Sequence, residues 1–156
     1  MFLSPHFSLA EATLSTTADR YRIDNSKPSA AVILAATSTA QHMEHVRTLL
    51  KAAISIGSWI RCLELNRKLG SKDTSQHIKG EAVDFICPKF GTATAVAKKL
   101  LAHKEEICFD QLILEHSWIH VSWNSIPGVK QRMQVLSLLN NGSYALGLTS
   151  PTGVPL

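Results

Sequence analysis

The sequence is short of charged residues, cysteines and long apolar runs, and each shortage excludes a class of protein. Only 18% of the 156 residues are charged and 45% are apolar, which excludes a disordered chain. The longest apolar run, 30–36, is much shorter than the roughly 20 residues of a membrane helix, so we expect no membrane span. The cysteines, Cys62, Cys87 and Cys108, are odd in number and include no C-x-x-C pair. Neither a disulfide scaffold nor a cysteine-rich zinc ribbon fits them.

The first residues of the chain and the distribution of its charges indicate whether the protein is exported and which kinds of partner it binds. A secretory signal peptide needs a basic segment and then an apolar stretch, but Pro5 and Glu11 interrupt the first residues. We therefore expect no export by the general secretory route. The net charge of +4 comes from scattered Lys and Arg residues, without the basic stripe and interleaved aromatics of a nucleic-acid interface. We expect no nucleic-acid partner, whereas a mildly basic surface suits an anionic polymer such as cell wall.

The length predicts one compact domain over residues 1–156, and we expect a monomer. A chain of this size can bury about two-thirds of its unfolded surface without disulfides. Apolar spacing predicts a short helix beginning near Leu9, a long helix with Pro28 in its first turn, and a helix over about 92–102. Alternating residues predict short strands, which we place at about 54–60, 82–86, 112–115 and 118–123. Helices first and strands later, with a tight hairpin at residues 116–117, indicate an α+β domain in which helices cover a small antiparallel sheet.

Two segments concentrate the side chains that bind metal ions. The first, residues 75–84, contains His77 and Asp84, and the second, residues 118–122, contains His120. Two histidines and a carboxylate are a plausible ligand set for a catalytic zinc ion, whose fourth position is left to water. Spacing alone does not fix the distance between the two segments. Surface or hydrogen-bonded roles for the three side chains therefore remain open at this point.

The same two segments resemble the signature of a known peptidase family. The pattern reads Ser75-x-His77-x-x-Gly80-x-Ala82-x-Asp84, followed by Trp118-x-His120-x-Ser122. It is similar to the zinc D-Ala-D-Ala carboxypeptidase and L-alanyl-D-glutamate endopeptidase family of bacterial cell-wall peptidases, which shares its fold with the hedgehog signalling domain. The likeness covers about residues 3–123 and leaves a weakly patterned C-terminal tail. It implies a hedgehog/DD-peptidase-like fold and Zn²⁺ held by His77, Asp84 and His120.

The resemblance also implies a substrate-binding arginine. Family members carry an arginine upstream of a Leu-Asn pair, and Arg61 keeps that spacing to Leu65 and Asn66. A guanidinium fork matches a substrate carboxylate with two parallel hydrogen bonds. Neighbouring residues such as Cys62 depart from the family pattern, which puts the shape of the pocket in doubt. The alternative is an ion pair between Arg61 and a surface acid such as Glu64.

The remaining candidate site residues lie beside the proposed ligands. Relatives carry a glutamate a few residues before the last zinc ligand, and Glu115 stands five residues before His120. We therefore expect Glu115 to be the catalytic general base, with His116 as the second candidate. Ser75 is expected to hydrogen-bond either substrate or its own turn, and Trp118 to form a wall of the substrate pocket.

Together these residues imply a zinc-dependent peptidase that hydrolyses the stem peptides of bacterial peptidoglycan. The sequence does not decide between release of terminal D-Ala and cleavage between L-Ala and D-Glu. Without a signal peptide the chain resembles phage lysins, which wait in the host cytoplasm for a holin, and virion-associated murein hydrolases. A non-catalytic zinc-containing protein, either a wall-binding module or a structural phage component, is the alternative. A second histidine pair, His42 and His45, is expected to lie on an exposed helix face.

Overall fold

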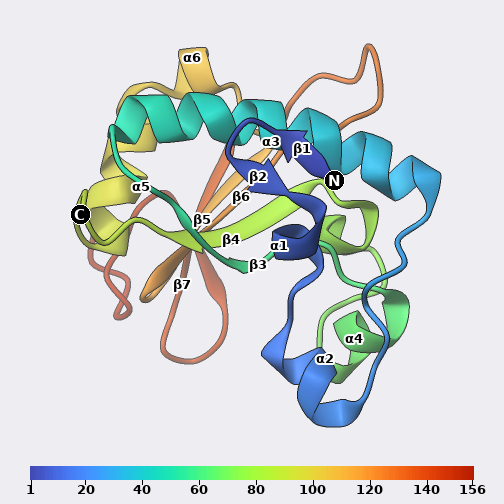
Figure 1. The fold of residues 1–156 in the computed structure, drawn as a ribbon. Coiled ribbons are helices and arrows are strands. Elements are labelled where there is room, and N and C mark those ends of the chain that lie inside the picture. Colours follow the sequence, from blue (N-terminus) through green and yellow to red (C-terminus); the bar gives the residue numbers. More distant parts are fainter.

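The computed structural model describes residues 1–156 and contains six α-helices, one 3-10 helix and eight strands. In chain order they are β1 (Phe2–Ser4), β2 (Phe7–Ser8), α1 (Leu9–Thr13), α2 (Thr16–Tyr21), α3 (Ala30–Leu50), β3 (Ser55–Ser58), α4 (Leu63–Lys68), η1 (Gln76–Lys79), β4 (Ala82–Ile86), α5 (Ala93–Ala102), α6 (Lys104–Ile107), β5 (Gln111–Glu115), β6 (Trp118–Ser122), β7 (Gln134–Leu138) and β8 (Tyr144–Leu146) (Figure 1). None of the helices combines the length and the apolar character that a bilayer crossing requires.

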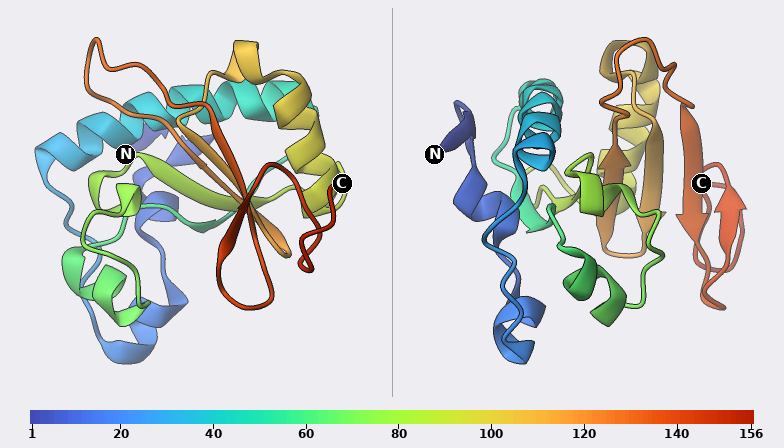
Figure 2. Two further views of the ribbon diagram at one scale, coloured as in Figure 1. Left: turned by 180° about the vertical axis from the view of Figure 1, so that it is seen from behind. Right: turned by 90° about the vertical axis from the view of Figure 1, so that its right-hand side faces the viewer.

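The strands form a small sheet and a larger one, so the predicted α+β class is confirmed. The small sheet pairs β1 with β2, and the larger has the order β3-β4-β6-β5-β7-β8. All pairs are antiparallel except β5 with β7, which run parallel. The larger sheet is therefore mixed rather than antiparallel throughout. The tail, whose sequence is weakly patterned, supplies its last two strands, and these lie on the far side of the molecule from the N-terminal segment (Figure 2).

Hydroxyl side chains fix where the predicted helices begin. Ser8, Ser29 and Thr92 each accept a hydrogen bond from a backbone N–H in the first turn of α1, α3 and α5. Such caps satisfy N–H groups that have no partner within the helix. The prediction that Pro28 lies in the first turn of the long helix is wrong. Because Ser29 is the capping residue, α3 begins at Ala30 and Pro28 lies just outside it.

Apolar residues alternate along the strands, so that one face of the larger sheet packs on the hydrophobic core. The buried residues on this face are Val83 and Phe85 of β4, Leu112 and Leu114 of β5, and Ile119 and Val121 of β6. They share a core with apolar residues of α3 and α5, among them Met43, Val46, Val96 and Leu100. Because neighbouring side chains in a strand point to opposite faces, the residues between them face away from this core.

One half-buried histidine differs from the sequence-based expectation. His45 is exposed on α3 as predicted, but His42 is half-buried. Its ring stacks on Trp123, with ring centroids 4.9 Å apart and ring planes 5° apart. The only group of potential metal ligands in the structure is elsewhere and contains neither histidine.

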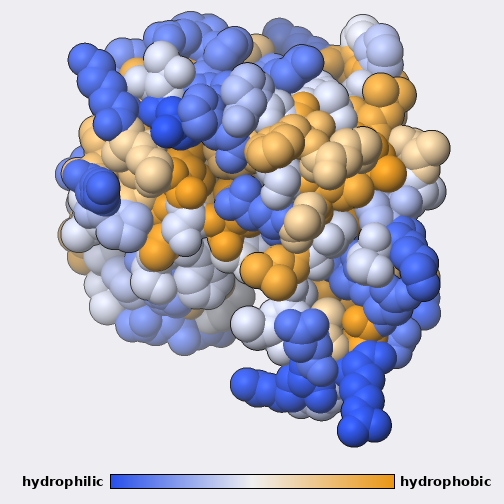
Figure 3. Space-filling view, viewed as in Figure 1, coloured by the Kyte–Doolittle hydropathy of each residue, from blue (hydrophilic) through white to orange (hydrophobic).

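A second, smaller apolar cluster joins α2 to α4 at one end of the molecule. It consists of Ala18, Ile23 and Leu65, with Cys62 packed against it. In Figure 3 this end of the molecule is mostly hydrophilic on its outside. The cluster fixes the segment between β3 and α4, which carries Arg61.

Gly80 occupies a position that no other residue fits well. It ends η1 in the left-handed region, with φ of 77°, and a Cβ there would lie 2.8 Å from the Val32 carbonyl oxygen of α3. We expect Gly80→Ala to destabilise the fold by about 2–4 kcal/mol, from backbone strain and from the forced separation of η1 and α3. Chemical denaturation measures this loss.

Gly142 provides the matched control for the Gly80 substitution. It has nearly the same φ, 82°, but open space where its Cβ would lie. Gly142→Ala should cost only the backbone strain, about 1–2 kcal/mol. Equal losses for the two variants would show that the close approach of Gly80 to α3 does not matter.

Candidate metal centre

Three side chains that the sequence predicts as metal ligands converge on one point of the core-distal sheet face. His77 comes from η1, Asp84 from β4 and His120 from β6. Asp84 and His120 are direct cross-strand partners, which places their side chains side by side on the same face. One nitrogen or oxygen atom from each residue lies within 4.8 Å of the others. The sequence does not determine how far apart the two motifs lie in space, and the structure places them close together.

His77 is held in a fixed orientation from behind. Its side chain is almost fully buried, and its Nδ1 lies 2.7 Å from the Trp59 carbonyl oxygen. When Nδ1 donates to that carbonyl, the lone pair of Nε2 faces Asp84, whose Oδ1 is 3.2 Å away. Burial lowers the pKa of His77, more than the neighbouring carboxylate raises it. The neutral ring is the form of histidine that binds metal ions.

Asp84 lies at the centre of the cluster and uses both of its oxygens. Its Oδ1 is 2.8 Å from Nδ1 of His120, and its Oδ2 accepts a hydrogen bond of 2.8 Å from Nη2 of Arg61. Burial alone would raise the pKa of Asp84, but the two neighbouring histidines hold it well below its usual range. The side chain is therefore an ionised carboxylate at neutral pH.

Arg61 belongs to the same cluster and does not pair with Glu64. Besides Asp84, its guanidinium donates to the Ser58 hydroxyl at 2.8 Å. Asn25 fixes the backbone on both sides of Arg61: its amide donates to the Ile60 carbonyl, and its oxygen accepts from the Cys62 N–H. The sequence gives no signal for this role of Asn25, which depends on the burial of its side chain in the fold.

The donor set fits a divalent metal such as zinc. Two imidazole nitrogens and one carboxylate oxygen are the three protein ligands typical of a catalytic zinc site. No other histidine, cysteine, aspartate or glutamate completes the group, so the protein leaves the remaining coordination position open. A purely structural zinc site would close that position with a fourth side chain.

Glu115 ends β5 on the same sheet face as the ligand cluster. Its cross-strand partner is Trp118, two residues before His120. Glu115 is half-buried, and this burial, together with the negative charge of Asp84, raises its pKa above the ordinary value. His120, His116 and the hydroxyl of Tyr144 act in the opposite direction. A carboxylate with a raised pKa is a better proton acceptor near neutral pH.

Comparison with known families agrees with this arrangement. Residues 5–122 match the family model described as Peptidase M15. The chain belongs to the peptidase M15 family. A comparison with individually curated proteins found none that matches. The matched range contains His77, Asp84, His120, Arg61 and Glu115, and it ends before β7 and β8.

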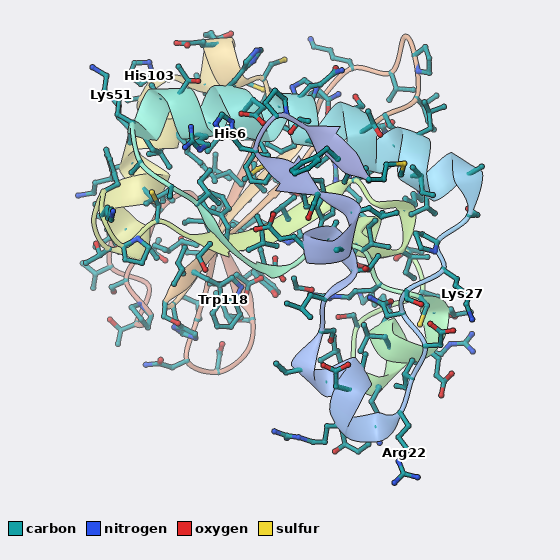
Figure 4. The ribbon with its side chains drawn as sticks, viewed as in Figure 1. His6, Arg22, Lys27, Lys51, His103 and Trp118 are labelled. Carbon is teal, nitrogen blue, oxygen red and sulfur yellow. The ribbon has the colours of Figure 1, made fainter.

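A cleft of about 340 Å³ opens beside the candidate centre of this M15 peptidase. Asp84 and Trp118 line it, together with Ser55, Gly57, Ser58, Phe85 and Ile86. Trp118 is 39% exposed, and Figure 4 shows it below the sheet, on the side away from α3. The position of Trp118 suits the pocket wall that the sequence led us to expect.

Two other predicted residues of the peptidase have different surroundings. The Ser75 hydroxyl accepts a hydrogen bond from the His77 N–H and so caps η1, which is the second of the two roles considered for it. His116 is exposed in the turn between β5 and β6, in the left-handed conformation with φ of 52°. It lines a small hollow with Leu114 and Pro151, on the other side of the sheet from Asp84. This placement favours Glu115 over His116 as the base.

Proposed function

We propose that this M15 peptidase is a zinc-dependent hydrolase of peptidoglycan stem peptides. The observation that carries the proposal is the convergence of His77, Asp84 and His120, with one coordination position left open beside an apolar-walled cleft. Glu115 on the same face supplies a carboxylate that no structural role requires. A wall-binding protein without activity would need neither an open position nor this carboxylate.

In the proposed mechanism the protein residues hold the ion and move one proton. His77, Asp84 and His120 would bind the metal. A bound zinc ion lowers the pKa of a water molecule and polarises the carbonyl of the scissile bond. Glu115 accepts the proton of the attacking water and delivers it to the departing amine, and positioned bases of this kind accelerate reactions by about 10²–10⁴-fold. Trp118 excludes water from one side of the peptide.

Arg61 has two tasks in this proposal. It holds Oδ2 of Asp84, which leaves Oδ1 directed at the two histidines. Its guanidinium has five N–H donors, of which Ser58 and Asp84 each accept one at 2.8 Å and Ser71 accepts a third at 3.4 Å. The remaining donors can bind a carboxylate of the stem peptide. Burial lowers the pKa of Arg61, although the group stays fully charged in the working range.

The proposal leaves two bonds of the stem peptide as candidates for cleavage, and the masses of the released fragments distinguish them. Purified muropeptides incubated with the protein should lose a terminal D-Ala if it is a carboxypeptidase, or separate L-Ala from D-Glu if it is an endopeptidase. Zinc bound to the protein without any new fragment would overturn the proposal and favour a non-catalytic wall protein. A phage context, as a lysin or a virion component, stays a prediction from the sequence resemblance.

Arg61→Lys tests the substrate-binding role. Lysine keeps the charge but cannot form two parallel hydrogen bonds, so we expect kcat/KM to fall about ten- to a hundredfold. Steady-state kinetics on a muropeptide and on its carboxylate-amidated analogue measure the effect. The wild type should prefer the free carboxylate, and Arg61→Lys should lose this preference.

Arg67→Lys is the matched control, because Arg67 also pairs with an aspartate, Asp73, but on the exposed surface. Its kinetics should equal those of the wild type. If Arg61→Lys slows both substrates equally, Arg61 acts only on Asp84 and the substrate carboxylate binds elsewhere.

A further inference from the structure

The C-terminal hairpin brings a tyrosine to the candidate active site. β7 pairs with β5 in parallel, with Ser137 opposite Leu114, and β8 pairs with β7, with Tyr144 opposite Leu138. Leu138 directly follows Ser137, and Glu115 directly follows Leu114. Glu115 and Tyr144 therefore lie at the same level of the sheet, two strands apart.

The pairing also places both side chains on the same sheet face. Paired residues in neighbouring strands point to the same side. Trp118, opposite Glu115, and His120, two residues further along β6, share this face. Tyr144 thus lies on the sheet face that carries Glu115, at the same level and with only β7 between them. Burial raises the pKa of Tyr144, and the negative charge of Glu115 raises it further. Tyr144 is 50% exposed, so the core does not need it.

We propose that Tyr144 is a positioning residue, whose hydroxyl donates a hydrogen bond to the Glu115 carboxylate and holds that base toward the ligand cluster. The catalytic consequence rests on the proposed function, whereas the proposed hydrogen bond does not. β8 lies outside the residues that match the family model, which end at 122. The active site would thus depend on the tail of this chain as well as on its family core.

Several charged groups face Glu115, and their effects must be separated from that of Tyr144. They are Asp84 from β4, His120 from β6, His116 from the adjoining turn, and Arg61 from the segment after β3. A hydrogen bond to the ionised carboxylate lowers its pKa. Removing only the Tyr144 hydroxyl should therefore raise the pKa of Glu115, while the other groups stay unchanged.

Tyr144→Phe is the test, because it removes the hydroxyl and keeps the ring. Tyr21→Phe is the matched control: Tyr21 is the other tyrosine of the chain, also 50% exposed, and stacks under Lys68 away from the site. Losing one hydrogen bond to the base should lower kcat about three- to tenfold, with KM nearly unchanged. The acid limb of the kcat profile should move to higher pH in Tyr144→Phe alone.

An NMR titration of the Glu115 carboxyl carbon, assigned with Glu115→Gln, gives a readout that does not need turnover. A higher pKa of Glu115 in Tyr144→Phe than in wild type and Tyr21→Phe supports the proposal, and an unchanged pKa overturns it. A raised pKa with unchanged kcat also overturns the positioning role. If the wild type hydrolyses no muropeptide, the proposed function fails, and the titration still decides whether Tyr144 binds Glu115.

Discussion

Replacing Glu115 by glutamine should reduce hydrolysis by about 10²–10⁴-fold, the usual contribution of a positioned general base. Glutamine has nearly the same shape but cannot accept the proton of the attacking water. Because Glu115 is half-buried and its burial raises its pKa, the neutral amide should be tolerated and the fold retained. Steady-state kinetics on a muropeptide measure the loss of hydrolysis. Zinc analysis measures the metal content, and circular dichroism shows whether the fold is retained.

His116→Ala is the control for this variant. His116 is the neighbouring residue and the other candidate base, but it is exposed in the hairpin turn. Its removal should change kcat by less than about threefold, since a turn residue with no fixed contact to substrate contributes little. Near-normal turnover of Glu115→Gln combined with an inactive His116→Ala would reverse the two roles.

His120→Ala should abolish stoichiometric metal binding and, with it, activity. Loss of a residue that only supports a metal ligand costs about 10–100-fold in affinity, so the loss of a ligand should cost at least about 100-fold. Of the three ligand substitutions, His120→Ala gives the result that is easiest to interpret. It leaves the Arg61–Asp84 pair intact, whereas Asp84→Ala would leave a buried guanidinium without its partner.

His45→Ala provides the control, since His45 is an exposed histidine on α3 outside the cluster. Metal analysis of dialysed protein should find about one zinc per chain in the wild type and in His45→Ala, and much less in His120→Ala. Full zinc content in His77→Ala, Asp84→Ala and His120→Ala alike would refute the ligand assignment.

The candidate ligand cluster could be predicted from the sequence because two short motifs carry its residues. A histidine, a small residue with left-handed freedom and an aspartate within eight residues restrict how the chain can turn, and Gly80 does adopt that conformation. The strands at 82–86 and 118–122 were also predictable from their alternation. What the pattern could not supply was the register, which sets Asp84 opposite His120.

The contributions of the tail and of the buried asparagine could not be read from the sequence. β7 lies parallel to β5 only after a long connection, and no local pattern encodes a pairing between such distant segments. Tyr144 therefore looked like an ordinary tail residue. Asn25 resembles a loop residue in sequence, and only the fold brings the backbone around Arg61 to it.

Stepwise return of zinc to metal-free protein tests the central claim most directly. Chelator-treated protein should release no fragment from purified muropeptides, as judged by mass analysis. Added zinc should restore cleavage in proportion, up to a plateau at about one equivalent per chain, because His77, Asp84 and His120 form a single candidate site. Cleavage that continues unchanged after the zinc has been removed, or that fails to appear at full zinc occupancy, would contradict the assignment of this M15 peptidase as a zinc-dependent murein hydrolase.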